Sequence, residues 1–347
     1  MKHYEFELGR AADILTRDLL KLKPGETFVI TADTESNAEV VNATARAAFA
    51  IGAKPMVIWL ASPLGVGRAA DPMLPVEALT GALRGADAWI EFNRQWLLYS
   101  TPHDEAMREN KRLRYLCLVG MNPDMMVRCI GRVDHEALKR FLEKAGNVLR
   151  AADRIRVTSP SGTELEFRNI AGRGALIRDG YADRPGTFMM GGFIAWAPDL
   201  ESISGTLVFD GSLSPPCGRL EEPIRTTIEA GVLVGIEGGP QAKQLAQYLD
   251  AFDHPRMRRI AHSSFGFHPN ARLSGDIVED ERVWGCTEWG IGHVGATLIP
   301  PNGIPAPSHS DGQSLNCSVW LDGRPMLETG RVVHPELVEL ARALGKG

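Results

Sequence analysis

Apolar positions in the first part of the chain alternate between two spacings, a helical repeat of about 3.6 residues and short continuous runs. Ala11, Leu15, Leu19 and Leu20 follow the helical repeat, whereas FVITAD (28–33) is a short apolar run typical of a buried strand. The same alternation predicts further helices and strands, with helices at 37–52, 75–86 and 134–152 and strands at 54–60 and 87–93. Strands separated by helices usually pair in parallel. We therefore expect residues 1–150 to form a three-layer α/β domain with a mainly parallel sheet.

The pattern changes near Ala151, where short strand-like segments follow one another between Gly- and Pro-rich turns. They predict antiparallel strands at 155–160, 163–169, 205–211 and 226–236, and a helix at 241–252. A single core stops growing at roughly 250 to 300 residues, so a chain of 347 residues favours two domains. We expect residues 151–347 to form an α+β domain.

Composition and charge exclude several classes of protein. The chain has 38 basic and 43 acidic residues, a net charge of −5, and no dense basic run, so nucleic acid is a poor candidate partner. The first ten residues carry charges where a signal peptide needs an apolar stretch, and no long apolar run could cross a membrane. Five scattered cysteines without a CxxC pair are typical of reduced thiols. We expect a cytoplasmic protein without a membrane partner.

The strongest local signal for chemistry is the segment Ser308-His309-Ser310-Asp311-Gly312. In an extended segment, residues i and i+2 point to the same side, so the His309 imidazole and the Asp311 carboxylate can meet one metal ion. An HxD pair is also common by chance. The alternative is a turn in which Asp311 caps backbone amides before a strand.

Further candidate ligands lie upstream of this segment. RRIAHSSFGFHPNA (258–271) contains His262 and His268, and we favour His262 because it directly follows an apolar run at the end of a strand. Two histidines and one carboxylate on one side of an ion leave open positions at which Fe(II) binds both an organic substrate and dioxygen. Glu288 and His293 lie between the two ligand segments, and either is a candidate accessory ligand or acid/base group.

Three other kinds of site, a dinucleotide-binding loop, a serine nucleophile and a cysteine nucleophile, have no support in the sequence. Gly290, Gly292 and Gly295 spell a literal GxGxxG, but prolines forbid the helix that a dinucleotide-binding loop requires after it. No GxSxG elbow of a serine hydrolase occurs. Cys217 has no neighbouring base in the sequence that would make it a nucleophile.

Five segments, in this order, resemble the 2,5-dihydroxypyridine 5,6-dioxygenase family, a divergent relative of the M29 (aminopeptidase T-like) metallopeptidases. They are GYADRPG (180–186), GTLVFDG (205–211), EAGVLVGIEGG (229–239), AHSSFGFHPNA (261–271) and SHSDGQSLNCSVWLDGRPM (308–326). The resemblance implies that His262, His309 and Asp311 are the 2-His-1-carboxylate iron ligands. It also implies self-association, because members of the family form homo-oligomers.

The chain departs from the family pattern at several acid/base positions. Where the resemblance places a glutamate before GYAD, this chain has Arg178, and where it places a histidine in the first domain, this chain has Tyr99, with His103 nearby. Tyr99 and His103 are therefore candidate proton-transfer groups, and Arg178 is a candidate partner for a substrate carboxylate. An ordinary surface arginine is the alternative for Arg178.

These observations favour a non-haem Fe(II) dioxygenase, of extradiol type, that opens a hydroxylated aromatic or N-heteroaromatic ring in a catabolic pathway. Its partners would be the small ring substrate and O₂. The alternative is a metal-dependent amide or cyclic-amide hydrolase, or an aminopeptidase, working with Mn or Zn. A non-catalytic binding protein is the third hypothesis.

Overall fold

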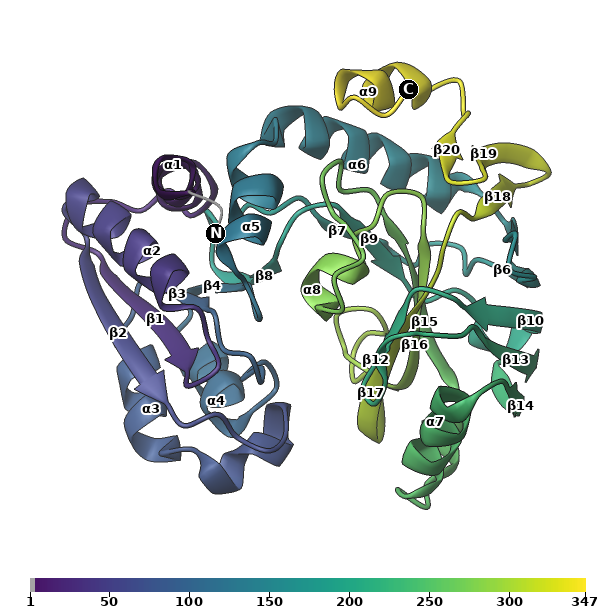
Figure 1. Ribbon diagram of the computed structural model, residues 1–347, viewed down its shortest axis with the longest axis horizontal. Helices are drawn as coiled ribbons and strands as arrows, with labels where there is room; N and C mark the ends of the chain where they lie inside the picture. Colours follow the sequence, from purple (N-terminus) through teal and green to yellow (C-terminus); the bar gives the residue numbers. More distant parts are fainter. Residues whose placement is uncertain (1–3) are drawn as a thin grey trace. The chain divides into compact units, whose positions relative to one another are not determined.

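The computed structural model describes residues 4–347, whose internal contacts divide the chain into two units (Figure 1). The first unit comprises Met1–Val133 and Arg178–Gly191, and the second comprises Asp134–Ile177 and Gly192–Gly347. No helix among the described residues is long and apolar enough to cross a membrane.

The first unit is built on a sheet in which every registered strand pair is parallel. Its strands, in sheet order, are β2 (Lys54–Leu60), β1 (Thr27–Asp33), β3 (Ala88–Glu91), β4 (Arg114–Cys117) and β8 (Gly186–Met189). Six of the seven residues of β1 are buried, as the continuous apolar run predicted for a strand covered on both faces. The parallel sheet expected from the sequence is therefore confirmed.

Helices connect these strands and fall into two packing groups. The helices of the first unit are α1 (Glu5–Asp13), α2 (Ala38–Ile51), α3 (Val76–Arg84), α4 (Thr101–Glu109) and α5 (Pro123–Met126). Helix α2 packs with α1 and α5, whereas α3 packs with α4. The longest of them, α2, begins at Asn37, whose side chain accepts hydrogen bonds from two amides of the first turn, and ends at Gly52, which has a φ of 89°.

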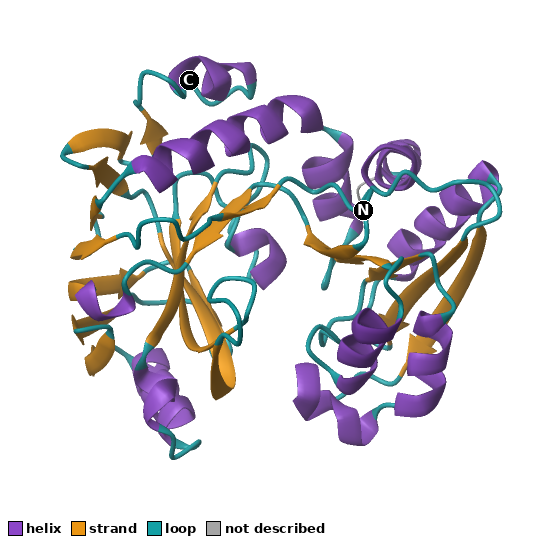
Figure 2. Ribbon diagram, turned by 180° about the vertical axis from the view of Figure 1, so that it is seen from behind, coloured by secondary structure: helices purple, strands orange, loops and turns teal. Residues whose placement is uncertain are grey.

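The second unit contains two sheets whose registered pairs are all antiparallel. The eight-stranded sheet has the order β14 (Val232–Glu237), β13 (Ile224–Glu229), β10 (Ser204–Phe209), β6 (Glu164–Arg168), β5 (Arg154–Thr158), β18 (Ser318–Leu321), β19 (Arg324–Glu328), β20 (Arg331–Val332). The seven-stranded sheet has the order β12 (Gly218–Arg219), β11 (Ser212–Ser214), β17 (Ile304–Ser314), β16 (Thr287–Val294), β15 (Ile260–Gly266), β9 (Phe193–Trp196), β7 (Leu176–Arg178). Both appear in orange in Figure 2. The antiparallel strands expected after Ala151 are thus present.

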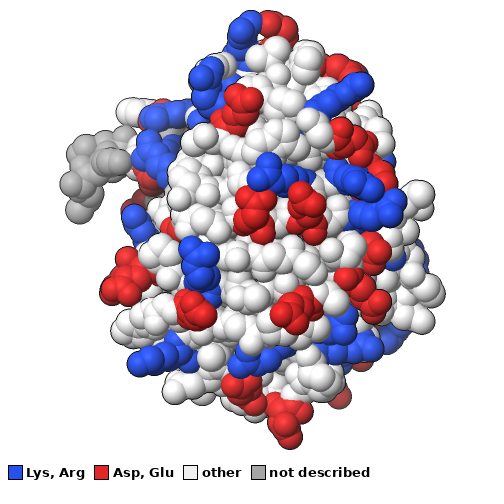
Figure 3. Space-filling view, turned by 90° about the vertical axis from the view of Figure 1, so that its right-hand side faces the viewer, with Lys and Arg blue, Asp and Glu red and all other residues white. Residues whose placement is uncertain are grey.

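Four α-helices of the described residues accompany these sheets: α6 (His135–Ala151), α7 (Pro240–Asp250), α8 (Ile277–Asp280) and α9 (Val338–Ala343). Helix α6 begins at Asp134, whose carboxylate accepts a hydrogen bond from the amide of Ala137. On the face of the molecule drawn in Figure 3, basic and acidic side chains are interspersed. Pairs such as Arg156 with Glu164 bring the charges together at the surface.

The division into units differs in two places from the expected boundary at residue 150. Helix α6, which we expected to end the first domain, packs on β9 and α9 and counts with the second unit. Residues 178–191 belong to the first unit because β8 extends the parallel sheet, with Gly186 beside Arg114 of β4. Both differences arise from contacts between segments far apart in the sequence.

Candidate metal centre

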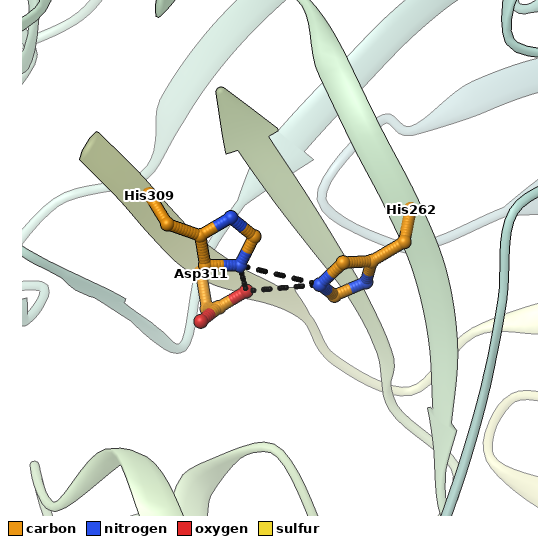
Figure 4. A group of neighbouring side chains, drawn as sticks. All are labelled: His262, His309 and Asp311. Atoms are coloured by element: carbon orange, nitrogen blue, oxygen red, sulfur yellow. Dashed lines mark hydrogen bonds and ion pairs between the residues drawn. The ribbon is translucent and has the colours of Figure 1, made fainter. Parts of the chain in front are cut away.

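Three neighbouring antiparallel strands of the second unit, β15, β16 and β17, bring His262, His309 and Asp311 together (Figure 4). His262 lies opposite Gly290 of β16, and Gly290 lies opposite Asp311 of β17. His309 is two residues before Asp311 on the same extended strand, so both side chains project from one face. The segment is a strand and not the turn that was the alternative interpretation.

The potential ligand atoms of these three side chains converge. The His309 Nε2 atom is 2.8 Å from Asp311 Oδ1, and the His262 Nε2 atom is 3.3 Å from His309 Nε2 and 3.5 Å from Asp311 Oδ1. Among residues 4–347, this is the single group of three or more His, Cys, Asp or Glu side chains whose ligand atoms converge in this way. Two imidazoles and one carboxylate suit a divalent transition metal.

Gly290 makes this convergence possible. A Cβ atom at this position would lie 2.5 Å from His262 Nε2 and 2.8 Å from His309 Cε1, inside the van der Waals contact distance of both rings. The missing side chain leaves the space over the middle strand where an ion would lie. The donor set and this space together fit a metal ion. Sequence reasoning noted Gly290 only within a rejected GxGxxG motif, and its role follows from the strand register.

The second ring nitrogen of His309 fixes the tautomer of this side chain. His309 Nδ1 is 2.6 Å from the backbone carbonyl oxygen of His293. A carbonyl oxygen only accepts hydrogen bonds, so Nδ1 carries a hydrogen, and Nε2 is the nitrogen that faces Asp311 and His262. Histidine ligands of metals commonly have such a partner on the second nitrogen. His293 thus acts here through its backbone, while its own Nδ1 accepts a 3.5 Å hydrogen bond from the Ala306 amide.

Burial and neighbouring charges shift the pKa values of the three side chains in different directions. Burial lowers the pKa of His262 to about 4, so this imidazole is neutral near pH 7. Burial alone would raise the pKa of Asp311, but His309 and His262 outweigh it and hold the pKa of this carboxyl well below its usual range. Burial would also lower the pKa of His309, yet Asp311 reverses the effect and raises it. Near pH 7, the imidazole of His262 is therefore neutral and the carboxylate of Asp311 is ionised.

Glu288 lies beside the convergent group without belonging to it. It is fully buried on β16, accepts a hydrogen bond from the Ser264 hydroxyl, and places Oε2 3.6 Å from His262 Nδ1. Burial raises the pKa of Glu288 well above its ordinary value, and the nearby Asp311 carboxylate adds to the shift. His268, the histidine that we did not favour, is also buried, and its Nδ1 accepts a hydrogen bond from the Asn270 amide.

The other candidate residues lie in the first unit. The exposed Tyr99 has a φ of 68°, and its backbone amide donates a 3.2 Å hydrogen bond to Nδ1 of the buried His103. His103 Nδ1 also lies 3.0 Å from Asp104 Oδ1. Arg178 is half-buried, and its Nη1 donates a 2.8 Å hydrogen bond to the backbone oxygen of Thr187. The structure thus brings Tyr99 and His103 together, while Arg178, the last residue of β7, contacts β8.

Comparison with known proteins identifies related sequences over most of the chain. The profile of a family described as 2,5-dihydroxypyridine 5,6-dioxygenase matches residues 15–334. A 2,5-dihydroxypyridine 5,6-dioxygenase of Pseudomonas putida is 28% identical over 320 residues, which are 87% of this chain and 89% of that protein.

Solved structures support the same fold. The structure of 2,5-dihydroxypyridine dioxygenase from Pseudomonas putida KT2440 has a TM-score of 0.77 and 23% sequence identity, and the match covers 97% of this chain and all of that one. AmpT from Thermus thermophilus has a TM-score of 0.70 and 18% identity, over 95% of this chain and 100% of the other. Both likenesses show a shared fold of parallel and antiparallel sheets.

Proposed function

The chain belongs to the 2,5-dihydroxypyridine 5,6-dioxygenase family, and on this premise we propose that it uses dioxygen to open the ring of a hydroxylated pyridine or a closely related hydroxylated aromatic. The observation that carries the proposal is the convergence of His262 Nε2, His309 Nε2 and Asp311 Oδ1 around the space that Gly290 leaves. This is the donor set of non-haem iron oxygenases.

We propose Fe(II) as the metal, with Mn and Zn as alternatives, held by these three side chains. When bound, the metal would lower the pKa of the substrate hydroxyl and provide a route for electrons between the ring and dioxygen. The protein contributes a preset geometry. His309 is held in one tautomer by the His293 carbonyl, His262 is neutral, and Asp311 supplies one negative charge. The hydrogen that Asp311 favours on His309 Nε2 would have to leave before this nitrogen could bind a metal.

The candidate acid/base groups differ in their surroundings. Tyr99 exposes its phenol on a strained backbone, and a bulky residue at positive φ often marks a functional position. We therefore propose Tyr99 as a group that exchanges a proton with the substrate, with His103 holding the Tyr99 amide. Arg178 is our proposed partner for a carboxylate on the ring. Self-association of the chain stays a prediction from the family resemblance.

The test is metal content and oxygen uptake. The protein is purified without oxygen, its metals are measured by mass spectrometry, and oxygen consumption is followed with a panel of hydroxylated pyridines. We expect about one iron per chain and one O₂ consumed per ring opened, by the stoichiometry of a ring-cleaving dioxygenase. His309→Ala should lose both. His334→Ala is the matched control, because His334 Nδ1 accepts a hydrogen bond from the Glu336 amide and lies outside the convergent group.

Two results would contradict the proposal. Zinc or manganese without oxygen uptake, together with hydrolysis of an amide or a cyclic amide, would assign the chain to metallohydrolase chemistry. Ring opening that persists in His309→Ala would remove the convergent group from the reaction.

A further inference from the structure

Glu288 occupies the position next to the convergent group on the middle strand. It is two residues before Gly290, so both residues face the same side of β16. Its partners in the strand register are Ser264 of β15 and Gln313 of β17. A second row of polar side chains therefore lies directly beside the row that contains His262 and Asp311.

The His262 ring lies between two carboxyl groups, one at each nitrogen. Its Nε2 faces Asp311 at 3.5 Å, and its Nδ1 faces Glu288 Oε2 at 3.6 Å. Nδ1 is buried and has no hydrogen-bond partner among the described residues. The gap to Glu288 is slightly longer than a hydrogen bond, so a small rotation of the ring would close it.

The two histidines differ in what supports them. His309 already has a partner on the nitrogen that points away from the group, the carbonyl oxygen of His293. For His262, the acceptor beside the equivalent nitrogen is the carboxyl of Glu288. Histidine ligands almost always donate this second N–H to a carboxylate, a carbonyl or water. Glu288 therefore fits the role of that partner.

Glu288 lies between polar side chains of both neighbouring strands. The Ser264 hydroxyl donates to its Oε2, while its Oε1 has no hydrogen-bond partner among the described residues. On the adjacent strand, Gln313 is fully buried, its Oε1 accepts hydrogen bonds from Ser212, and its Nε2 donor has no partner. An acceptor and a donor without partners thus occupy facing register positions, and Asp311 and Glu281 are the other carboxyl groups whose charge acts on Glu288.

We propose that Glu288 is a positioning residue, which accepts the Nδ1–H of His262 and thereby presents His262 Nε2 to the metal, and that Ser264 and Gln313 hold Glu288 in place. Glu288 is then not a ligand, because it contacts the nitrogen opposite to the one that faces the group. The role does not depend on the charge of Glu288, since the carbonyl oxygen of a neutral carboxyl also accepts a hydrogen bond. The inference rests on the proposed metal centre.

The test measures Co(II) binding to the full-length protein by its visible absorption, with Glu288→Ala and Glu288→Gln as the two variants. Loss of such a partner weakens metal binding by about 10- to 100-fold, which is what we expect for Glu288→Ala. Glu288→Gln keeps an acceptor oxygen, so it should bind Co(II) nearly as tightly as the wild type. The shape and intensity of the Co(II) spectrum should stay the same in Glu288→Gln, because the ligand set is unchanged.

Each other outcome is decisive. A changed Co(II) spectrum in Glu288→Gln, with a loss of affinity as large as in Glu288→Ala, would make Glu288 a ligand. If Glu288→Ala binds Co(II) as tightly as the wild type, Glu288 does not position His262. If Glu288→Ala does not fold, Gln313→Leu replaces it, and weaker Co(II) binding with an unchanged spectrum is expected. Failure of the wild type to bind Co(II) would instead contradict the proposed metal centre.

Discussion

At the level of single residues, the centre depends on a position that has no side chain. Gly290 is flanked in the strand register by His262 and Asp311, and the space above its Cα is where the two imidazoles approach each other. Its backbone does not have a positive φ, so strain does not demand glycine here. The need for glycine comes only from the side chains on the neighbouring strands.

Gly290→Ala should therefore weaken metal binding and leave the fold intact. The added methyl group would displace the His262 ring, and changes that disturb the orientation of a ligand cost about 10- to 100-fold in metal affinity. Gly295→Ala is the matched control, because no atom lies within 4 Å of a Cβ built at that position. Titration with Co(II) and circular dichroism of both variants provide the measurement. Wild-type binding by Gly290→Ala would show that the rings do not need this space.

A second residue-level prediction concerns Glu91 in the first unit. This buried side chain accepts hydrogen bonds from the Tyr115 hydroxyl and the Leu97 amide, and Tyr115 stacks on Trp89 with ring centroids 4.0 Å apart. Burial raises the pKa of Glu91 from 4.5 to about 7, although both hydrogen bonds lower it. The folded state therefore holds a proton on Glu91 at pH values where the unfolded chain has lost it.

The stabilisation from this proton is complete below about pH 4.5 and disappears as the pH rises through about 7. Between about pH 5 and pH 8, the wild type should lose roughly 2 to 3 kcal/mol more free energy of unfolding than Glu91→Gln. Urea unfolding followed by tryptophan fluorescence gives these values, and Glu77→Gln, at an exposed glutamate, is the control. Equal pH dependence of the wild type and Glu91→Gln would contradict the prediction.

Residue types and their spacing predicted part of the site. His309 and Asp311 share a face because their segment is extended, and the two-residue spacing already states this. His262 was favoured over His268 because it directly follows an apolar run. The sequence also indicated Glu288 as a candidate for the site, but it could not show that Gly290 and Gln313 lie beside these side chains, because strand register depends on contacts across 20 residues or more.

At the level of elements, the spacing of apolar residues correctly predicted the strands and helices whose structure depends mainly on their own sequence. The expected strands at 28–33 and 54–60 are β1 and β2, and the expected helix at 241–252 is α7. The short strands β7, β8 and β9 are three or four residues long and carry weak local signals, and they were not predicted. Their structure comes from their neighbours in the sheets.

Helix α2 allows a prediction about its N-terminal cap. Asn37 Oδ1 accepts hydrogen bonds from the amides of Glu39 and Val40, which otherwise have no partner within the helix. Asn37→Ala should lower the free energy of unfolding by about 1 kcal/mol, while Asn37→Ser should retain most of it. Asn42→Ala, at an exposed position inside the same helix, should be neutral or slightly stabilising, because alanine is the better helix former. Similar losses in Asn37→Ala and Asn42→Ala would show that the cap contributes nothing.

At the level of the whole molecule, the two units are interleaved along the chain. The change near Ala151 from alternating helices and strands to successive short strands indicated two domains. This pattern could not assign α6 to the second unit or residues 178–191 to the first. Both assignments depend on packing between segments separated by tens of residues, such as β4 with β8. All three proposed ligands nevertheless belong to the second unit, on strands β15 and β17.

This placement predicts where metal binding stabilises the protein. An ion that binds only the folded state adds about 2.7 kcal/mol of stability at a free concentration 100 times its dissociation constant. Hydrogen exchange followed by mass spectrometry, with and without Co(II), should show slower exchange in β15, β16 and β17 and little change in β1 and β2. His309→Ala should remove the difference, because it loses a proposed ligand. Slower exchange in the first unit alone, or none anywhere at saturating Co(II), would contradict the centre, since its ligands tie together strands of the second unit only.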